Sequence, residues 1–168
     1  MKLNVSSLNP NRKTMKPSQI TFVLALLLFS NFAFAQSVVG TWKRTSIIIE
    51  DAKGESKEMQ QMMEKASPCS AKITYSFLAS GAQKTNIPAD AECQKILSKI
   101  AEFAADVKYQ LAGSKITVFS NKKELYPDAT YQLNFSGNTM TWLFDYASNP
   151  STPNPTKAKK MKIVYTKI

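Results

Sequence analysis

The sequence contains no histidine among its 168 residues. Histidine is the commonest general base near neutral pH and the commonest metal ligand, so its absence excludes Ser-His and Cys-His catalysis. The five glycines form no phosphate-binding loop, and no clustered acidic loop of the calcium type occurs. We therefore expect a protein that is not an enzyme and that uses no metal and no cofactor.

Long apolar runs are also lacking, apart from one short stretch near the N-terminus. Lys16 precedes the apolar residues 22–29, and the small-residue pattern Ala33-Phe34-Ala35 follows. A membrane helix needs roughly 20 apolar residues, whereas a charged start, a short apolar run and a cleavage pattern are typical of a secretory signal peptide. We interpret residues 1–35 as a signal peptide rather than an uncleaved anchor, with Met15 as an alternative start.

Cleavage after residue 35 leaves 36–168, enough for one compact domain and too little for two. Residue 36 is Gln rather than the Cys that bacterial lipoproteins acylate, so we expect a soluble secreted or periplasmic product without an integral membrane span. The removed segment holds four basic residues and no acidic one, so the net charge falls from +10 to +6. Export argues against a nucleic-acid partner.

Cysteine is scarce, and both cysteines, Cys69 and Cys93, fall in the expected domain. No Cys-x-x-Cys occurs, which argues against a redox role. Export places the pair in an oxidising compartment, where two cysteines usually form a disulfide. Such a bond, across 24 positions of the chain, would stabilise the domain by about 3 kcal/mol.

Short stretches of alternating apolar and polar residues, separated by turn residues, fill most of the domain. This pattern is typical of an antiparallel sheet with one buried face. The expected strands cover residues 38–49, 72–79, 82–85, 107–111, 115–119, 131–135, 140–146 and 161–166. About eight strands fit the chain, the number that closes a barrel able to hold one small ligand.

Two segments with helical periodicity interrupt the strands. Residues 55–66 are rich in methionine, and residues 88–105 place Cys93, Ile96 and Ile100 on one face. The second helix needs an apolar surface to cover, so we expect it over one end or flank of the barrel. The three prolines of residues 148–156 predict a long loop before the last strand.

The first expected strand opens with Val39-Gly40-Thr41-Trp42-Lys43, directly after the signal peptide. With its later strand-turn-strand patterns, the chain from 38 to 168 resembles the small lipocalin-like domains of exported bacterial proteins, in which Gly-x-Trp opens the first strand. The resemblance implies a mainly β fold, an antiparallel up-and-down eight-stranded lipocalin-like barrel with two helical insertions. In lipocalins an arginine late in the chain often packs across this tryptophan, and here only lysines such as Lys167 are available.

Aromatic side chains recur on the face that would point into such a barrel. An interior lined by rings and a few phenolic hydroxyls suits a small apolar or amphipathic ligand. The alternative is that these side chains simply fill a dry core. Trp42 is expected to close the base of the barrel. Our candidate ligand-binding residues are Tyr75, Tyr109, Tyr131, Phe135, Trp142 and Phe144.

A second hypothesis is a non-catalytic envelope or secreted interaction module that binds a protein or glycan through its helices and a basic loop. Four lysines near the C-terminus would meet an anionic surface, or would simply belong to a solvated loop. A cavity of several hundred cubic ångströms favours the ligand carrier, and a filled interior with an exposed apolar patch favours the partner binder. The four lysines are Lys157, Lys159, Lys160 and Lys162.

Overall fold

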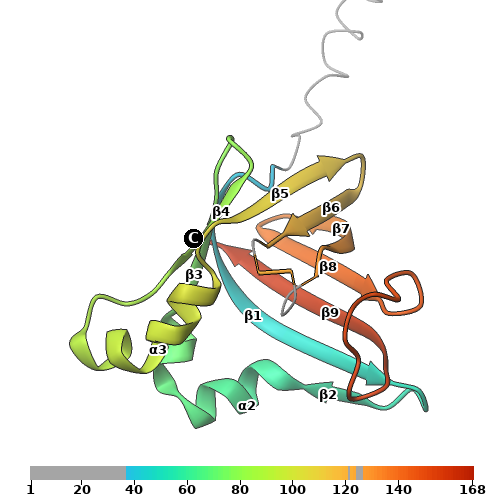
Figure 1. Cartoon of the computed structure of the whole chain (residues 1–168), viewed down its shortest axis with the longest axis horizontal. Helices are drawn as coiled ribbons and strands as arrows, with labels where there is room; N and C mark the ends of the chain where they lie inside the picture. Colours follow the sequence, from blue (N-terminus) through green and yellow to red (C-terminus); the bar gives the residue numbers. More distant parts are fainter. Residues whose placement is uncertain (1–36, 121, 124–126) are drawn as a thin grey trace, which may run out of the picture. The chain divides into compact units, whose positions relative to one another are not determined.

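The computed structural model describes residues 37–120, 122–123 and 127–168, so the predicted signal peptide at 1–35 lies outside the described residues. Eight antiparallel strands close into a barrel, and two helices are inserted between them (Figure 1). The prediction of a mainly β, up-and-down eight-stranded barrel with two helical insertions is therefore confirmed. The strands are β1 (Gly40–Asp51), β2 (Ser56–Glu58), β3 (Thr74–Phe77), β4 (Ala82–Asn86), β5 (Val107–Ala112), β6 (Lys115–Phe119), β7 (Ala129–Ser136), β8 (Thr139–Asp145) and β9 (Ala158–Lys167).

The ring closes because β1 pairs with β3 on one edge and with β9 on the other. The ladder between β1 and β9 runs from Trp42 opposite Lys167 to Asp51 opposite Ala158. The short strand β2 lies on the same edge of β1 as β3, but at the opposite end, beside Ile48–Glu50. It therefore extends the edge of β1 and does not add a wall strand to the ring.

The two ends of the barrel differ in their connections. At one end, which we call the base, β1 begins and three short turns join β3 to β4, β5 to β6 and β7 to β8. Gly81 in the first of these turns has a φ of 82°, and a Cβ there would lie 3.0 Å from the carbonyl oxygen of Tyr109. The other end, which we call the mouth, carries the helices and the longer connections from β6 to β7 and from β8 to β9.

The base is filled by apolar side chains around Trp42, which is 1% exposed and donates its Nε1–H to the carbonyl oxygen of Val38 at 2.7 Å. The Nζ of Lys167 lies 5.4 Å from the centre of the Trp42 ring. A Cβ on Gly40, whose φ is 139°, would come within 3.0 Å of the Lys167 side chain. The ammonium group of Lys167 thus packs on the tryptophan ring.

The helices are α2 (Met59–Ala66) and α3 (Ala91–Phe103), and a 3-10 turn, η1 (Pro68–Lys72), follows α2. The predicted helix at 55–66 starts later because residues 56–58 pair with β1 as β2. Glu58 then caps α2, since its carboxylate accepts hydrogen bonds from the backbone N–H of Gln60 at 2.9 Å and of Ile47 at 3.0 Å.

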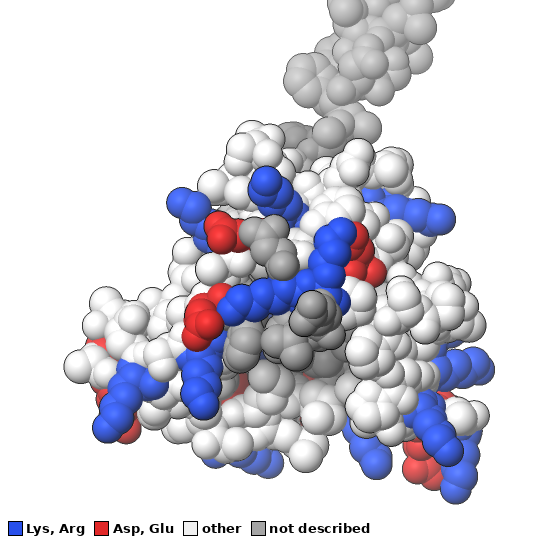
Figure 2. Space-filling view, in the orientation of Figure 1, with Lys and Arg blue, Asp and Glu red and all other residues white. Residues whose placement is uncertain are grey.

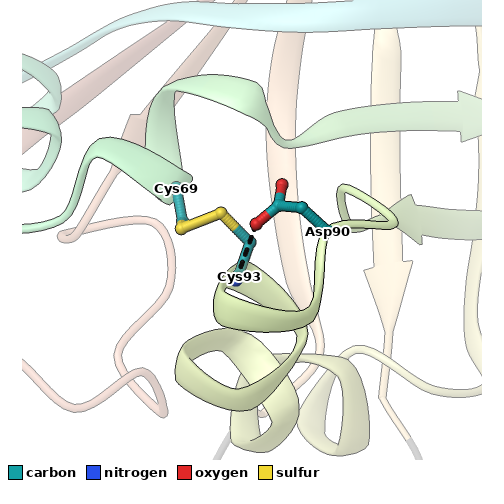
Figure 3. A group of neighbouring side chains, drawn as sticks. All are labelled: Cys69, Asp90 and Cys93. Atoms are coloured by element: carbon teal, nitrogen blue, oxygen red, sulfur yellow. Dashed lines mark hydrogen bonds between the residues drawn. A yellow bond between two sulfur atoms is a disulfide. The ribbon is translucent and has the colours of Figure 1, made fainter.

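A disulfide joins Cys69 in η1 to Cys93 in the first turn of α3, with a Cα–Cα distance of 5.3 Å (Figure 3). The predicted disulfide is confirmed. Asp90 caps α3 beside it, because its carboxylate accepts a hydrogen bond from the backbone N–H of Cys93 at 2.9 Å. This bond is the main reason that the pKa of Asp90 lies below its usual value. The start of α3 is therefore fixed both covalently and by its cap.

Candidate functional site

A cavity of 610 Å³ lies at the mouth end of the barrel and is partly open to solvent. Its walls come from the inward faces of the barrel strands, from Ile100 and Ala104 at the end of α3, and from Thr152 and Pro153 in the connection between β8 and β9. Binding sites for small molecules usually measure about 300–1,000 Å³. The interior of this barrel is therefore filled at the base and hollow at the mouth.

Aromatic rings form a continuous wall on one side of this cavity. The ring of Trp142 lies 5.1 Å from that of Tyr131 and 5.1 Å from that of Tyr165, and Tyr75 lies 5.6 Å from Tyr165. All four side chains line the cavity. Rings at these distances support one another and present a rigid surface to an apolar ligand.

Polar atoms without a protein partner lie in the same wall. The Nε1 of Trp142, the Oε1 of Gln83 and the Oγ1 of Thr152 are buried and make no hydrogen bond to another described residue. A buried polar group usually has a partner, because leaving it unpaired costs about 1–3 kcal/mol. The residues that carry these atoms line the cavity, while the three atoms themselves have almost no accessible surface.

The tyrosine hydroxyls of the cavity are also unengaged among the described residues. No described residue forms a hydrogen bond with the hydroxyl of Tyr75, Tyr131 or Tyr165. Burial, with a smaller contribution from Tyr146, raises the pKa of Tyr131 to about 12, and burial raises the pKa of Tyr75 and of Tyr165 as well. These phenols stay protonated near neutral pH and act as hydrogen-bond donors.

One cation, Arg44, faces this interior immediately before a β-bulge in β1. The ladder with β9 skips Thr45, since Arg44 lies opposite Tyr165 while Ser46 lies opposite Val164. The extra residue changes the alternation, so Trp42 and Arg44 face inward before the bulge and Ile47 faces inward after it. The bulge lets a charged side chain and the apolar second half of β1 share one interior.

The guanidinium of Arg44 is oriented by two neighbours. Its Nε donates to the Oε1 of Gln60 at 2.8 Å, and the Nε2 of Gln60, which is 2% exposed, donates to Glu64 at 2.8 Å. The Cζ of Arg44 lies 5.4 Å from the centre of the Tyr75 ring. The helix α2 thus holds the arginine against the aromatic wall of the cavity.

The structure separates the predicted site residues into two groups. Tyr75, Tyr131 and Trp142 line the cavity. Tyr109 lies nearer the base, where its ring packs on Phe77 and its hydroxyl donates to the carbonyl oxygen of Leu78 at 2.7 Å. The other two candidates do not line the cavity either: Phe135 packs 6.3 Å from Trp42, and Phe144 packs between Tyr131 and Tyr146.

Sequence reasoning missed Arg44, Gln83 and Tyr165 as members of this site. Tyr165 follows the same alternation as Ile163 in the last strand, so extending that pattern would have found it. Arg44 stands two residues after Trp42, which the resemblance places inside the barrel. Strict alternation along a strand was the available signal for both.

The outer surface shows no separation of charge on the face drawn in Figure 2, where acidic side chains lie beside several of the basic ones. Within the C-terminal lysine group, Lys159 pairs with Glu50 at 3.8 Å, and Lys160 and Lys162 lie exposed on β9. These two lysines border a surface groove of 510 Å³ that Glu50 and Asp145 also line. The groove is of mixed charge.

Cys69, Cys93 and Asp90 form the one group of potential metal ligands found among the described residues (Figure 3). Both sulfur atoms belong to the disulfide, so neither is available as a thiolate. Within the described ranges no helix combines the length and the apolar character needed to cross a membrane.

No protein-family model, no curated protein and no solved structure matches this chain.

Proposed function

We propose that this protein is an exported, lipocalin-like, non-enzymatic carrier that holds a small apolar or amphipathic ligand in the mouth of its barrel. The observation that carries the proposal is the 610 Å³ cavity behind Trp142, Tyr131 and Tyr165. A barrel whose aromatic side chains merely filled a core would leave no such volume. The disulfide is consistent with work outside the cytoplasm, in the periplasm or the medium.

The lining supports an amphipathic occupant. Aromatic and aliphatic side chains supply most of the wall, and a few polar atoms interrupt it, which is the usual composition of a small-molecule site. The hydroxyls of Tyr75 and Tyr131, which make no hydrogen bond to another described residue, would gain a partner from a ligand with a polar group. Burial of the apolar part would supply most of the affinity.

The alternative, an interaction module that uses its helices, is favoured by a different observation. Met62, Ile96 and Ile100 are 58%, 51% and 38% exposed on the two helices. Single exposed apolar side chains are common on protein surfaces, however, and Ile100 also lines the cavity. The cavity is the larger and more organised feature, so the carrier is the function we propose.

Binding of the neutral fluorescent probe N-phenyl-1-naphthylamine to the purified protein tests the proposal. We expect saturable binding with one site, and loss of that binding in the variant Ala104→Trp, whose indole would occupy the cavity. The matched control is Ala101→Trp, in the last turn of the helix that Ala104 caps, at an exposed position that does not line the cavity. Absence of binding to the unmodified protein, or equal binding to both variants, would refute the proposal.

A further inference from the structure

The cavity contains one positive charge, that of Arg44, and no acidic side chain of the described residues forms an ion pair with it. The ion pairs among the described residues join Lys72 to Asp90, Lys122 to Glu102, Lys123 to Asp128 and Lys159 to Glu50. Arg44, which lines the cavity, takes part in none of them. A guanidinium partly removed from water without a carboxylate is unusual, because burial penalises a charge that is not paired.

The hydrogen bonds of Arg44 leave its best anion-binding edge open. Its Nε is engaged by Gln60, whereas its two terminal Nη groups make no hydrogen bond to another described residue. Those two groups present parallel N–H donors that match the two oxygens of a carboxylate. The acidic residue nearest along this network, Glu64, is reached only through Gln60 and faces Nε2 of that amide.

Phenolic donors surround the same position. Tyr165 lies directly opposite Arg44 in the ladder between β1 and β9, and the ring of Tyr75 lies under the guanidinium at 5.4 Å. Both side chains line the cavity, and their hydroxyls have no hydrogen-bond partner among the described residues. One cation and two phenols thus line the same cavity beside an aromatic wall, and their N–H and O–H donors favour an anion.

We infer that the ligand is an amphiphile with a carboxylate head, whose two oxygens bind the Nη groups of Arg44 and the hydroxyls of Tyr75 and Tyr165. Its apolar body lies against Trp142 and Tyr131. The inference rests on the proposed carrier function and adds to it the chemical class of the ligand. The hydrogen bond that the Nε of Arg44 donates to the Oε1 of Gln60 holds the arginine in place for this purpose.

The test compares dodecanoate with dodecanol, which share an apolar body and differ in the charged head. Each ligand displaces N-phenyl-1-naphthylamine from the unmodified protein, from Arg44→Gln and from Arg44→Lys. We expect the unmodified protein to prefer dodecanoate on the order of tenfold, since a charge-assisted bidentate pair is about twice as strong as a neutral hydrogen bond. Arg44→Gln should lose this preference while it still binds dodecanol, and Arg44→Lys should keep part of it.

Lys115→Gln is the matched control for net charge, because Lys115 is exposed at the base of the barrel and does not line the cavity. This variant should keep the full preference for dodecanoate. Equal affinities of the unmodified protein for the two ligands, or a preference that survives Arg44→Gln, would overturn the inference and leave the carrier function standing. Failure of the probe and of both ligands to bind would overturn both.

Discussion

Gly40, Trp42 and Lys167 come from the two ends of the described chain and meet at the base of the barrel. The tryptophan is buried, and the lysine packs across it. Gly40 has a φ of 139°, which side chains rarely tolerate, and the space beside it is taken by Lys167. These three residues close the base, so the hollow end is the mouth alone.

Replacement of Gly40 by alanine tests this arrangement. We expect Gly40→Ala to lower the free energy of unfolding by about 1–3 kcal/mol, because of backbone strain and displacement of Lys167 from the Trp42 ring. The control is Gly54→Ala, since Gly54 also has a positive φ of 86° but has no atom within 4 Å of its Cβ position. Urea denaturation followed by circular dichroism measures both, and an equal loss in the two variants would contradict a specific role for the contact.

The two tryptophans of the chain lie at different depths in the barrel and report on them separately. Trp142 lines the cavity, whereas Trp42 is buried at the base. We expect dodecanol to change the tryptophan emission of the unmodified protein and of Trp42→Phe, and to leave that of Trp142→Phe nearly unchanged. A ligand-dependent signal that remains in Trp142→Phe and disappears in Trp42→Phe would show that the ligand binds beside Trp42 at the base, which would contradict the proposed site.

Ionisation of Tyr131 is expected to lower the stability of the fold at alkaline pH. Burial raises its folded pKa to about 12, above the unfolded value of about 10. The neutral phenol therefore contributes stability that is fully present below pH of about 10 and is lost as the pH rises through about 12. Between these limits we expect the unmodified protein to lose about 3 kcal/mol more of its free energy of unfolding than Tyr131→Phe does.

Denaturant titrations of both proteins at a series of pH values measure this difference. Below pH 10 the difference in free energy of unfolding between the two proteins should not vary with pH. If the two curves remain parallel up to pH 12, the phenol is not buried in the way that the structure shows.

At the scale of elements, α3 covers part of the mouth but is attached to the barrel at few points. Its contacts with other elements are concentrated at η1, where the disulfide lies, and Ile100 and Ala104 at its other end line the cavity. In the chain, β4 precedes α3 and β5 follows it. The ladder between these two strands pairs only Ala82 with Lys108 and Gln83 with Val107. The disulfide and the buried side chain of Leu97, which is 1% exposed, are therefore the contacts that hold α3 in place.

Removal of the disulfide tests this view. We expect the double variant Cys69→Ser and Cys93→Ser to lose about 3 kcal/mol of its free energy of unfolding, as chain entropy predicts for a loop of this length. Hydrogen exchange of the α3 amides should rise more than that of the β1 and β9 amides. An unchanged exchange pattern would show that packing, rather than the disulfide, holds the helix.

Elements with local signals could be predicted from the sequence, and those that depend on long-range geometry could not. The hairpins of β5 with β6 and of β7 with β8 follow from alternation and a glycine turn, and both formed as expected. The segment at 56–58 looks helical but becomes β2, because the free edge of β1 offers hydrogen bonds to it.

The site was predictable only in part for the same reason. Alternation placed Tyr75, Tyr131 and Trp142 on the inward face, where the structure has them. Alternation could not say how deep each residue lies along the barrel, so Phe135 at the base was grouped with residues of the mouth. Whether the interior is filled or hollow depends on how the side chains pack together, which no pattern along the chain records.

At the scale of the whole molecule, the described chain is a barrel with a closed base, a hollow mouth and a tethered helix beside that mouth. We propose that residues 1–35 direct its export, so the purified product should begin at Gln36, and the intact mass of the exported protein measures this. A product that retains residues 1–35 would contradict the signal-peptide interpretation.

Native mass spectrometry tests the carrier function most directly. The protein is sprayed as purified from its own host after export, and again after incubation with dodecanoate and with dodecanol. We predict the mass of the disulfide-bonded chain increased by one small molecule, released on denaturation, with dodecanoate retained more strongly than dodecanol. The bare mass alone under all three conditions would contradict the account.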